Sequence, residues 1–162
     1  MKYLKISVGI FTVLAVSRFI PHPPNFTSLL ALSFYVPALL GQKFIPSLII
    51  SFAITDLIIG YHFGTHWTWG SVLLIGLISV YFKKNIFWRI SGALLGASIF
   101  FLVTNFGVWT TGQYGLNIVG LKTTYILAIP FFTYSLISTF VFSGIIEGLI
   151  KLNLIKLRTL KY

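Results

Sequence analysis

The chain contains no cysteine and very few acidic residues. Its 162 residues include only two Asp or Glu, against twelve Lys or Arg. Without thiols, disulfides, thiolate metal sites and cysteine nucleophiles are excluded. The sequence also lacks a Ser–His–carboxylate set, paired carboxylates at one depth, a Gly-rich phosphate loop and a Walker motif. We therefore expect no enzyme activity, and we predict no catalytic residue, metal site or cofactor.

Charge of either sign is scarce. Only 9% of the residues are charged and 57% are apolar, whereas a soluble domain carries about 25% charged residues. The formal net charge of +10 would suggest nucleic-acid binding in a soluble protein. Here the basic residues stand at the ends of apolar runs, where they act as topology signals and contact membrane lipids. We expect a membrane protein without a nucleic-acid partner.

Continuous apolar runs, rather than alternating ones, dominate the sequence. Only helices or closed barrels satisfy the backbone in lipid, so these runs predict an all-α, polytopic bundle of six transmembrane helices. The second and fourth runs are shorter than the roughly 20 residues that a full crossing needs. Residues 1–150 would form one membrane domain and residues 151–162 a basic cytoplasmic tail. The expected spans are 6–20, 28–40, 44–60, 69–82, 86–104 and 124–149.

The basic residues are distributed unevenly between the two sides of this arrangement. Only Arg18 and Lys122 fall on the side opposite all the others. Because Lys and Arg are retained in the cytoplasm, both termini are predicted to be cytoplasmic, in a cytoplasmic (inner) membrane. The small residues Ala15 to Ser17 also resemble a signal-peptide cleavage site, so a retained or a cleaved first helix is possible.

The predicted external side carries the aromatic and polar residues. Aromatic walls with a few polar groups are typical of a small-molecule pocket, although an aromatic belt at the membrane interface would have a similar composition. Metal binding by His62 and His66 is weakly supported, because Gly64 lies between them. The candidate ligand-binding residues are Arg18, His22, Asn25, Asp56, His62, Trp67, Asn105 and Trp109.

The two acidic residues and two glycines suggest structural contacts. Asp56 lies within a span, where a charge is costly, and Arg18 at comparable depth is a natural partner; a ligand is the alternative partner. Glu147 is expected to be solvated at the inner interface or paired locally near Lys151; contact with a cytoplasmic partner is the alternative. Gly92 and Gly96 allow close helix packing within the bundle or docking of another subunit.

External connectors complete the arrangement. Residues 61–69 are expected to form an aromatic loop, and residues 105–121 the longest connector.

Three stretches resemble a family of uncharacterised six-pass bacterial membrane proteins, which is similar to the substrate-binding S components of energy-coupling-factor (ECF) transporters. They are RFIPHPPNFT at 18–27, TNFGVWTTG at 104–112 and AIPFF at 128–132; residues 40–57 resemble the second and third helices of S components. The resemblance implies capture of a vitamin-like or other small micronutrient at the external face. It also implies a separate transmembrane coupling subunit with ATPases.

One feature departs from that resemblance. S components commonly dock the coupling subunit through small residues four apart on the first helix, where this chain has only Gly9 and Ala15. The alternative function is a structural or assembly protein that binds another membrane protein through its external loops. A membrane enzyme, with His22 or Asp56 as its acid–base group, is a third and weaker hypothesis.

Overall fold

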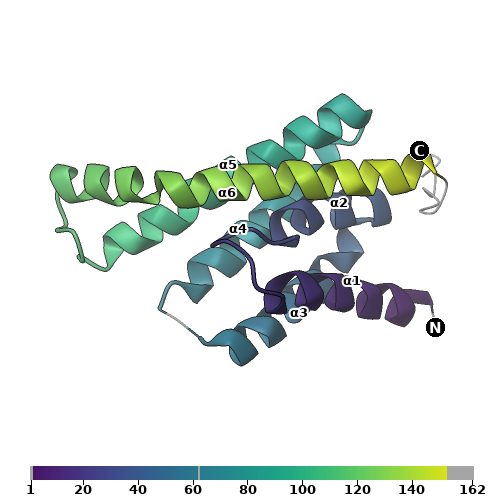
Figure 1. The fold of residues 1–162 in the computed structure, drawn as a ribbon, viewed down its shortest axis with the longest axis horizontal. Helices are drawn as coiled ribbons and strands as arrows, with labels where there is room; N and C mark the ends of the chain where they lie inside the picture. The colour runs from purple at the N-terminus through teal and green to yellow at the C-terminus, as the bar shows by residue number, and fades with distance from the viewer. Residues whose placement is uncertain (1, 62, 153–162) are drawn as a thin grey trace.

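The protein is helical throughout the part that the computed structural model describes, residues 2–61 and 63–152. Figure 1 shows long and short helices packed against one another. The α-helices are α1 (Lys2–Phe19), α2 (Leu29–Leu40), α3 (Ile45–Ile59), α4 (Thr65–Ile78), α5 (Ile86–Thr110) and α6 (Ile118–Lys151), with short 3₁₀ helices at Gln42–Phe44 and Ser79–Phe82. The prediction of an all-α fold is confirmed over the described residues.

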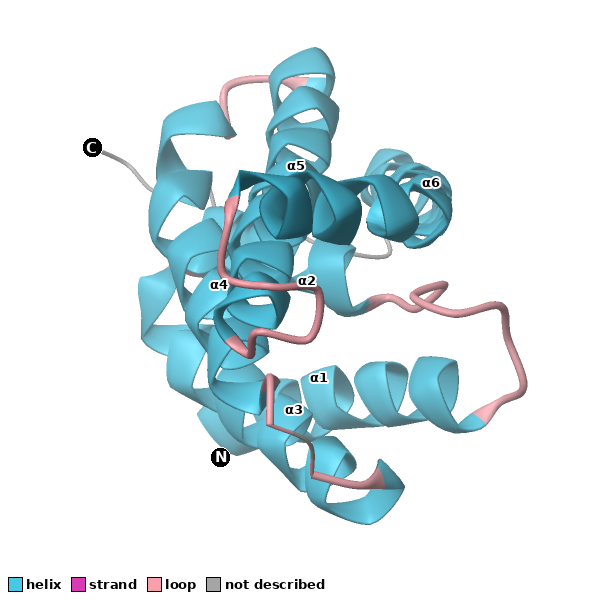
Figure 2. Ribbon diagram, turned by 90° about the vertical axis from the view of Figure 1, so that its left-hand side faces the viewer, coloured by secondary structure: helices cyan, strands magenta, loops and turns pink. Residues whose placement is uncertain are grey.

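Helix α2 forms the centre of the bundle. Every residue from Leu29 to Ala38 is buried, and α2 contacts all five other helices. The two longest helices, α5 and α6, lie side by side, while α1 packs mainly on α3 (Figures 1 and 2). A helix that is apolar on all sides is stable only when neighbours cover it, which explains the central position of this short segment.

Within the described residues, three helical segments are long and apolar enough to cross a membrane. They are Gln42–Ile59, Ile86–Thr110 and Ile118–Lys151. At 1.5 Å per residue, α2 and α4 span only about 18 Å and 21 Å, less than the roughly 30 Å of a hydrocarbon core. Helix α1 has 18 residues but contains Lys2, Lys5 and Arg18. Large apolar side chains, such as Leu57 and Phe87, are exposed on the helix surfaces, as expected for contact with lipid.

The helix ends differ from the predicted connectors. Helix α5 continues to Thr110 and α6 begins at Ile118, so the predicted connector 105–121 shrinks to residues 111–117. Similarly, α4 begins at Thr65 inside the predicted loop 61–69. Polar side chains are accommodated in these helical turns by bonds to their own helix: Thr110 Oγ1 donates to Gly107 O at 2.6 Å. The predicted tail lies outside the described residues beyond position 152, and Lys151 belongs to α6.

Gly92 and Gly96 pack inside the chain. A Cβ atom on Gly92 would lie 2.5 Å from the ring of Phe34 on α2, and one on Gly96 would lie 2.9 Å from Ile75 on α4. Small residues therefore let α5 approach the two shorter helices closely. These contacts correspond to packing within the bundle, and the two positions are covered by the chain itself.

Candidate functional site

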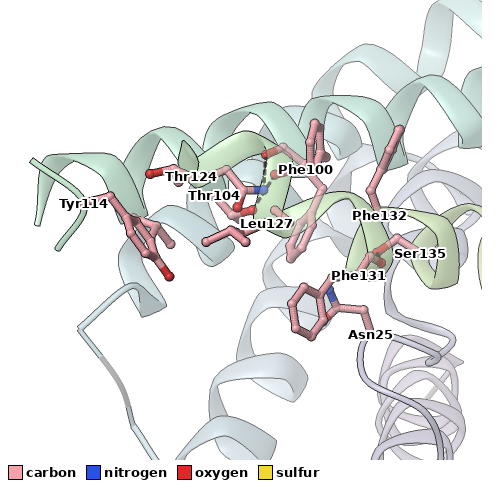
Figure 3. A pocket seen from close by; sticks show the side chains of 13 residues that line it. Asn25, Phe100, Thr104, Tyr114, Thr124, Leu127, Phe131, Phe132 and Ser135 are labelled. Carbon is pink, nitrogen blue, oxygen red and sulfur yellow. Dashed lines mark hydrogen bonds between the residues drawn. The ribbon is translucent and has the colours of Figure 1, made fainter. Parts of the chain in front are cut away.

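A pocket of about 270 Å³ lies between α5, α6 and the loop that joins α1 to α2. Figure 3 shows side chains from both long helices projecting into this space, with Asn25 approaching from the loop and Tyr114 from the α5–α6 connector. None of its lining side chains is ionisable at neutral pH. The lining residues are Asn25, Phe100, Phe101, Thr104, Asn105, Val108, Tyr114, Thr124, Leu127, Ala128, Phe131, Phe132 and Ser135.

Aromatic rings form much of the pocket wall. Phe101 and Phe132 stack with ring centroids 4.4 Å apart and an interplanar angle of 22°. Tyr125 meets the edge of Phe101 at 5.5 Å and donates a hydrogen bond to Leu102 O at 2.7 Å, which joins α6 to α5. Aromatic pairs of this kind add about 0.5–1.5 kcal/mol beyond the area that they bury. The wall is therefore held by contacts between the two helices.

The polar groups of the pocket mostly use their hydrogens within their own helices. Asn105 Nδ2 donates to Phe101 O at 2.7 Å and Thr104 Oγ1 donates to Phe100 O at 2.8 Å. On α6, Thr124 and Ser135 likewise donate to carbonyl oxygens four residues earlier. An amide oxygen and a hydroxyl oxygen both retain acceptor capacity after such a bond. The walls thus present oxygen acceptors, together with amide N–H donors on Asn25 and Asn105 and the Tyr114 hydroxyl.

Asn25 reaches the pocket because of an unusual backbone conformation. Its φ angle is +62°, a left-handed value that Asn adopts more readily than most residues. The turn is closed by a hydrogen bond from Phe26 N to Pro23 O at 3.0 Å. Ser138 Oγ on α6 donates to Asn25 O at 3.3 Å. The Pro-rich loop is therefore fixed against α6.

The α5–α6 connector that carries Tyr114 is also well defined. Asn117 Oδ1 accepts a hydrogen bond from Gly120 N at 2.9 Å and caps α6. Trp109 Nε1 donates to Asn117 O at 3.3 Å. The bond from Trp109 holds the capped start of α6 against the end of α5.

Arg18 and Asp56 form a second, separate cluster. Arg18 Nη2 lies 2.6 Å from Asp56 Oδ1, and their side chains are only 14% and 4% exposed. Arg18 Nη1 also donates to Thr55 Oγ1 at 2.6 Å, and Trp69 Nε1 donates to Asp56 Oδ2 at 2.7 Å. The guanidinium lies 4.6 Å from the centre of the Phe52 ring. The expected ion pair is present, but neither of its residues lines the pocket.

The other predicted ligand-binding residues are dispersed. Trp67 packs against Gly107 of α5, where a Cβ atom would overlap its indole ring, and against Phe106. His22 is exposed and its Nδ1 lies 2.7 Å from Pro23 O. His62 lies outside the described residues. Of the seven predicted positions that the structure describes, it therefore brings only Asn25 and Asn105 to the pocket.

A buried ion pair between the start of α5 and the end of α6 was not predicted. Arg89 on α5 binds Glu147 on α6 in a bidentate manner, with Nε–Oε1 and Nη2–Oε2 distances of 2.6 Å. Tyr35 donates to Glu147 Oε1 at 2.9 Å. The expectation of a solvated or locally paired Glu147 is wrong, because the carboxylate is 6% exposed. The sequence did contain a signal for this pair: Arg89 lies near the start of one long span and Glu147 near the end of the next, so the two residues lie at similar depths.

The described residues contain no group of three His, Asp or Glu that could hold a metal ion. The chain matches a family of unknown function (DUF6580) over residues 2–160. It belongs to this family. No curated protein and no solved structure matches the chain. For this DUF6580 member, a functional assignment therefore depends on the pocket and its surroundings.

Proposed function

We propose that this DUF6580 member is a membrane transport protein that captures a small, neutral molecule at its external face. The pocket between α5 and α6 carries this proposal. It combines aromatic walls with a few polar groups, as ligand sites do, and its volume of about 270 Å³ suits a small molecule. The described residues that line it include no Asp, Glu, His, Lys, Arg or Cys, so binding rather than catalysis is the proposed activity.

The chemistry of the lining narrows the ligand class. The walls offer oxygen acceptors on Thr104, Asn105, Thr124 and Ser135, and each of these side chains donates one hydrogen to a backbone carbonyl. A complementary ligand carries hydrogen-bonding groups, N–H or O–H donors among them, on a flat or partly apolar body that can pack on phenylalanine rings. A purely apolar lipid tail would leave the polar groups of the wall without partners, which is costly, so it is a poorer fit.

The proposed arrangement in the membrane has six crossings, with both termini in the cytoplasm of a bacterium. The start of α1, the turn between α4 and α5 and the end of α6 lie toward one end of the molecule (Figure 1), and these segments carry Lys2, Lys5, Lys83, Lys84 and Lys151. Basic residues of this kind mark the cytoplasmic side. The α5–α6 connector, beside the pocket, lies at the other end and faces outward.

Delivery of the ligand across the membrane would follow the pattern of ECF S components. The chain has no nucleotide-binding motif, so a separate coupling subunit with ATPases would supply the energy. Only Gly9 and Ala15 are available on α1 as small docking residues, and the coupling partner would therefore differ from a standard module.

Native mass spectrometry of the protein purified in mild detergent tests the pocket. We expect a bound molecule that is absent from Ala128→Phe, because Ala128 lines the pocket and a phenyl ring would fill it. Asn105→Leu, which removes the amide oxygen, should weaken binding by roughly 10-fold, as expected for a lost hydrogen bond to a buried donor.

Val141→Phe is the matched control, since Val141 is exposed on the same helix and does not line the pocket. A parent protein that carries no small molecule, or an Ala128→Phe protein that retains it, would contradict the proposal.

An assembly role is the second candidate. Tyr61 and Phe63, between α3 and α4, are 64% and 71% exposed, and exposed aromatic residues are common in interfaces. Co-purification of one membrane protein in fixed proportion, abolished by Tyr61→Ser with Phe63→Ser but not by Ala128→Phe, would favour this role over ligand capture.

A further inference from the structure

A second groove, of about 260 Å³, lies between α1 and α6. It runs along α2, on the side of that helix that faces away from α4 and α5. Figures 1 and 2 show α1 and α6 on either side of α2, which leaves α2 as the floor. The walls are aliphatic: Ile6, Gly9 and Val13 from α1, Leu32 and Val36 from α2, and Ile146 from α6. The groove is thus an apolar channel along the inner half of the bundle.

The groove offers almost no polar group to an occupant. Leu32, Tyr35 and Val36 on its floor are each at most 9% exposed. The Tyr35 hydroxyl is already bonded to Glu147 at 2.9 Å. An occupant of this groove must therefore be an aliphatic chain or an apolar side chain.

Basic residues flank one end of the groove. Lys2 lies four residues before Ile6 on α1, and Lys5 lies four residues before Gly9, so both share the helix face that lines the groove. Lys151 ends α6, five residues after Ile146. None of these three lysines forms an ion pair within residues 2–61 and 63–152. The apolar groove therefore opens beside uncompensated positive charge.

The size of the groove and the charge beside it together favour one occupant. One turn of a helix with its side chains, about 10–12 Å across and 5.4 Å high, encloses on the order of 500 Å³, so only the side chains of a docked helix could enter the groove, and an apolar helix would not neutralise the flanking lysines. An apolar cavity of about 150 Å³ holds a benzene-sized molecule, and about 260 Å³ holds a segment of an acyl chain. We propose that this groove binds one acyl chain of an anionic glycerophospholipid, with Lys2 and Lys5 contacting its phosphate headgroup. The proposal is independent of the external pocket.

Lipid titration followed by native mass spectrometry tests the headgroup contact. Phosphatidylglycerol and phosphatidylcholine with the same acyl chains are the two probes, added to the full-length protein in detergent. Each lysine near a lipid headgroup favours the anionic lipid by roughly 5-fold, so the parent should prefer phosphatidylglycerol by roughly 25-fold. Lys2→Gln with Lys5→Gln should reduce this preference to near parity, whereas Lys122→Gln at the opposite end should leave it unchanged.

Gly9→Leu tests the groove itself. A Cβ atom on Gly9 meets nothing within 4 Å, so the chain accepts a leucine, which would occupy the space of the acyl chain. Binding of the first lipid should fall at least about 10-fold with either headgroup, because each buried methylene contributes roughly 4-fold. Gly144→Leu is the control, since Gly144 is equally unobstructed on α6 and does not line the groove.

Three results would overturn the proposal. The first is equal binding of both lipids by the parent. The second is unchanged lipid binding by Gly9→Leu. The third is a parent dimer that Gly9→Leu disrupts, which would assign the groove to a second copy of the chain. The lysine substitutions lie on exposed positions and do not depend on how well the Gly9→Leu protein folds.

Discussion

Arg18 illustrates at the residue scale how a buried charge is satisfied in this protein. Its guanidinium contacts the carboxylate of Asp56, the hydroxyl of Thr55 and the ring of Phe52. Trp69 satisfies the second carboxylate oxygen. The Asp56 carboxylate of α3, which binds Arg18 of α1 and Trp69 of α4, therefore ties three helices together. Arg18, one of the two basic residues placed away from the others, thus has a structural explanation.

Arg18→Leu should reduce the apparent free energy of unfolding by about 3–5 kcal/mol, because it leaves the Asp56 carboxylate buried without its partner. Unfolding in mixed detergent micelles measures this loss. Arg18→Leu combined with Asp56→Leu should cost less than the sum of the two single changes, since the pair is coupled.

Lys122→Leu serves as the control, because Lys122 is exposed at the start of α6, and it should change the stability by less than about 0.5 kcal/mol. Additive effects of the Arg18 and Asp56 substitutions would contradict the assignment of a buried, coupled pair.

Sequence reasoning at the residue scale could pair Arg18 with Asp56 because a charge within an apolar span demands a partner. It could not find the pairing of Arg89 with Glu147, since Lys151 offered a nearer partner in sequence. The pocket was only partly predictable for a similar reason. Asn25 and Asn105 were found from their polarity, whereas Phe100, Phe131 and Ser135 look like ordinary residues of a span until α5 and α6 are placed side by side.

At the scale of elements, the close approach of α5 to α2 depends on glycine. Gly92→Ala should reduce the free energy of unfolding by about 1–3 kcal/mol, because the added Cβ would lie 2.5 Å from Phe34 and 2.6 Å from Phe82. Thermal unfolding in detergent, followed by circular dichroism, measures the effect.

Gly144→Ala is the matched substitution in open space on α6, where nothing lies within 4 Å. It should stabilise the helix by about 0.5–1 kcal/mol through helix propensity alone. Equal changes in the free energy of unfolding at the two positions would show that contact between helices does not restrict the size of the side chain at position 92.

Element boundaries were the least predictable part of the fold. Asn105, Thr110 and Thr65 are polar and lie near predicted ends, so hydropathy assigned them to connectors. In the structure each is helical, because a helix continues as long as its backbone bonds are satisfied, whether or not its side chains are apolar. Short helices such as α2 were predictable, since a continuous apolar run needs burial on every side.

At the scale of the whole molecule, the proposed orientation can be tested directly because the chain has no native cysteine. We expect Gln113→Cys, in the connector between α5 and α6, to react with a membrane-impermeant maleimide in intact bacterial cells. Lys84→Cys, in the turn between α4 and α5, should react only after permeabilisation. The reverse pattern would invert the proposed topology and place the pocket on the cytoplasmic side.

The uncharged lining of the pocket has an energetic consequence. A charge that moves through a membrane potential gains or loses about 2.3 kcal/mol per 100 mV, but a neutral ligand in a neutral pocket transfers none. Loading this site would therefore be insensitive to membrane voltage and nearly insensitive to ionic strength. A protein with this lining accumulates its ligand only if another component performs the work.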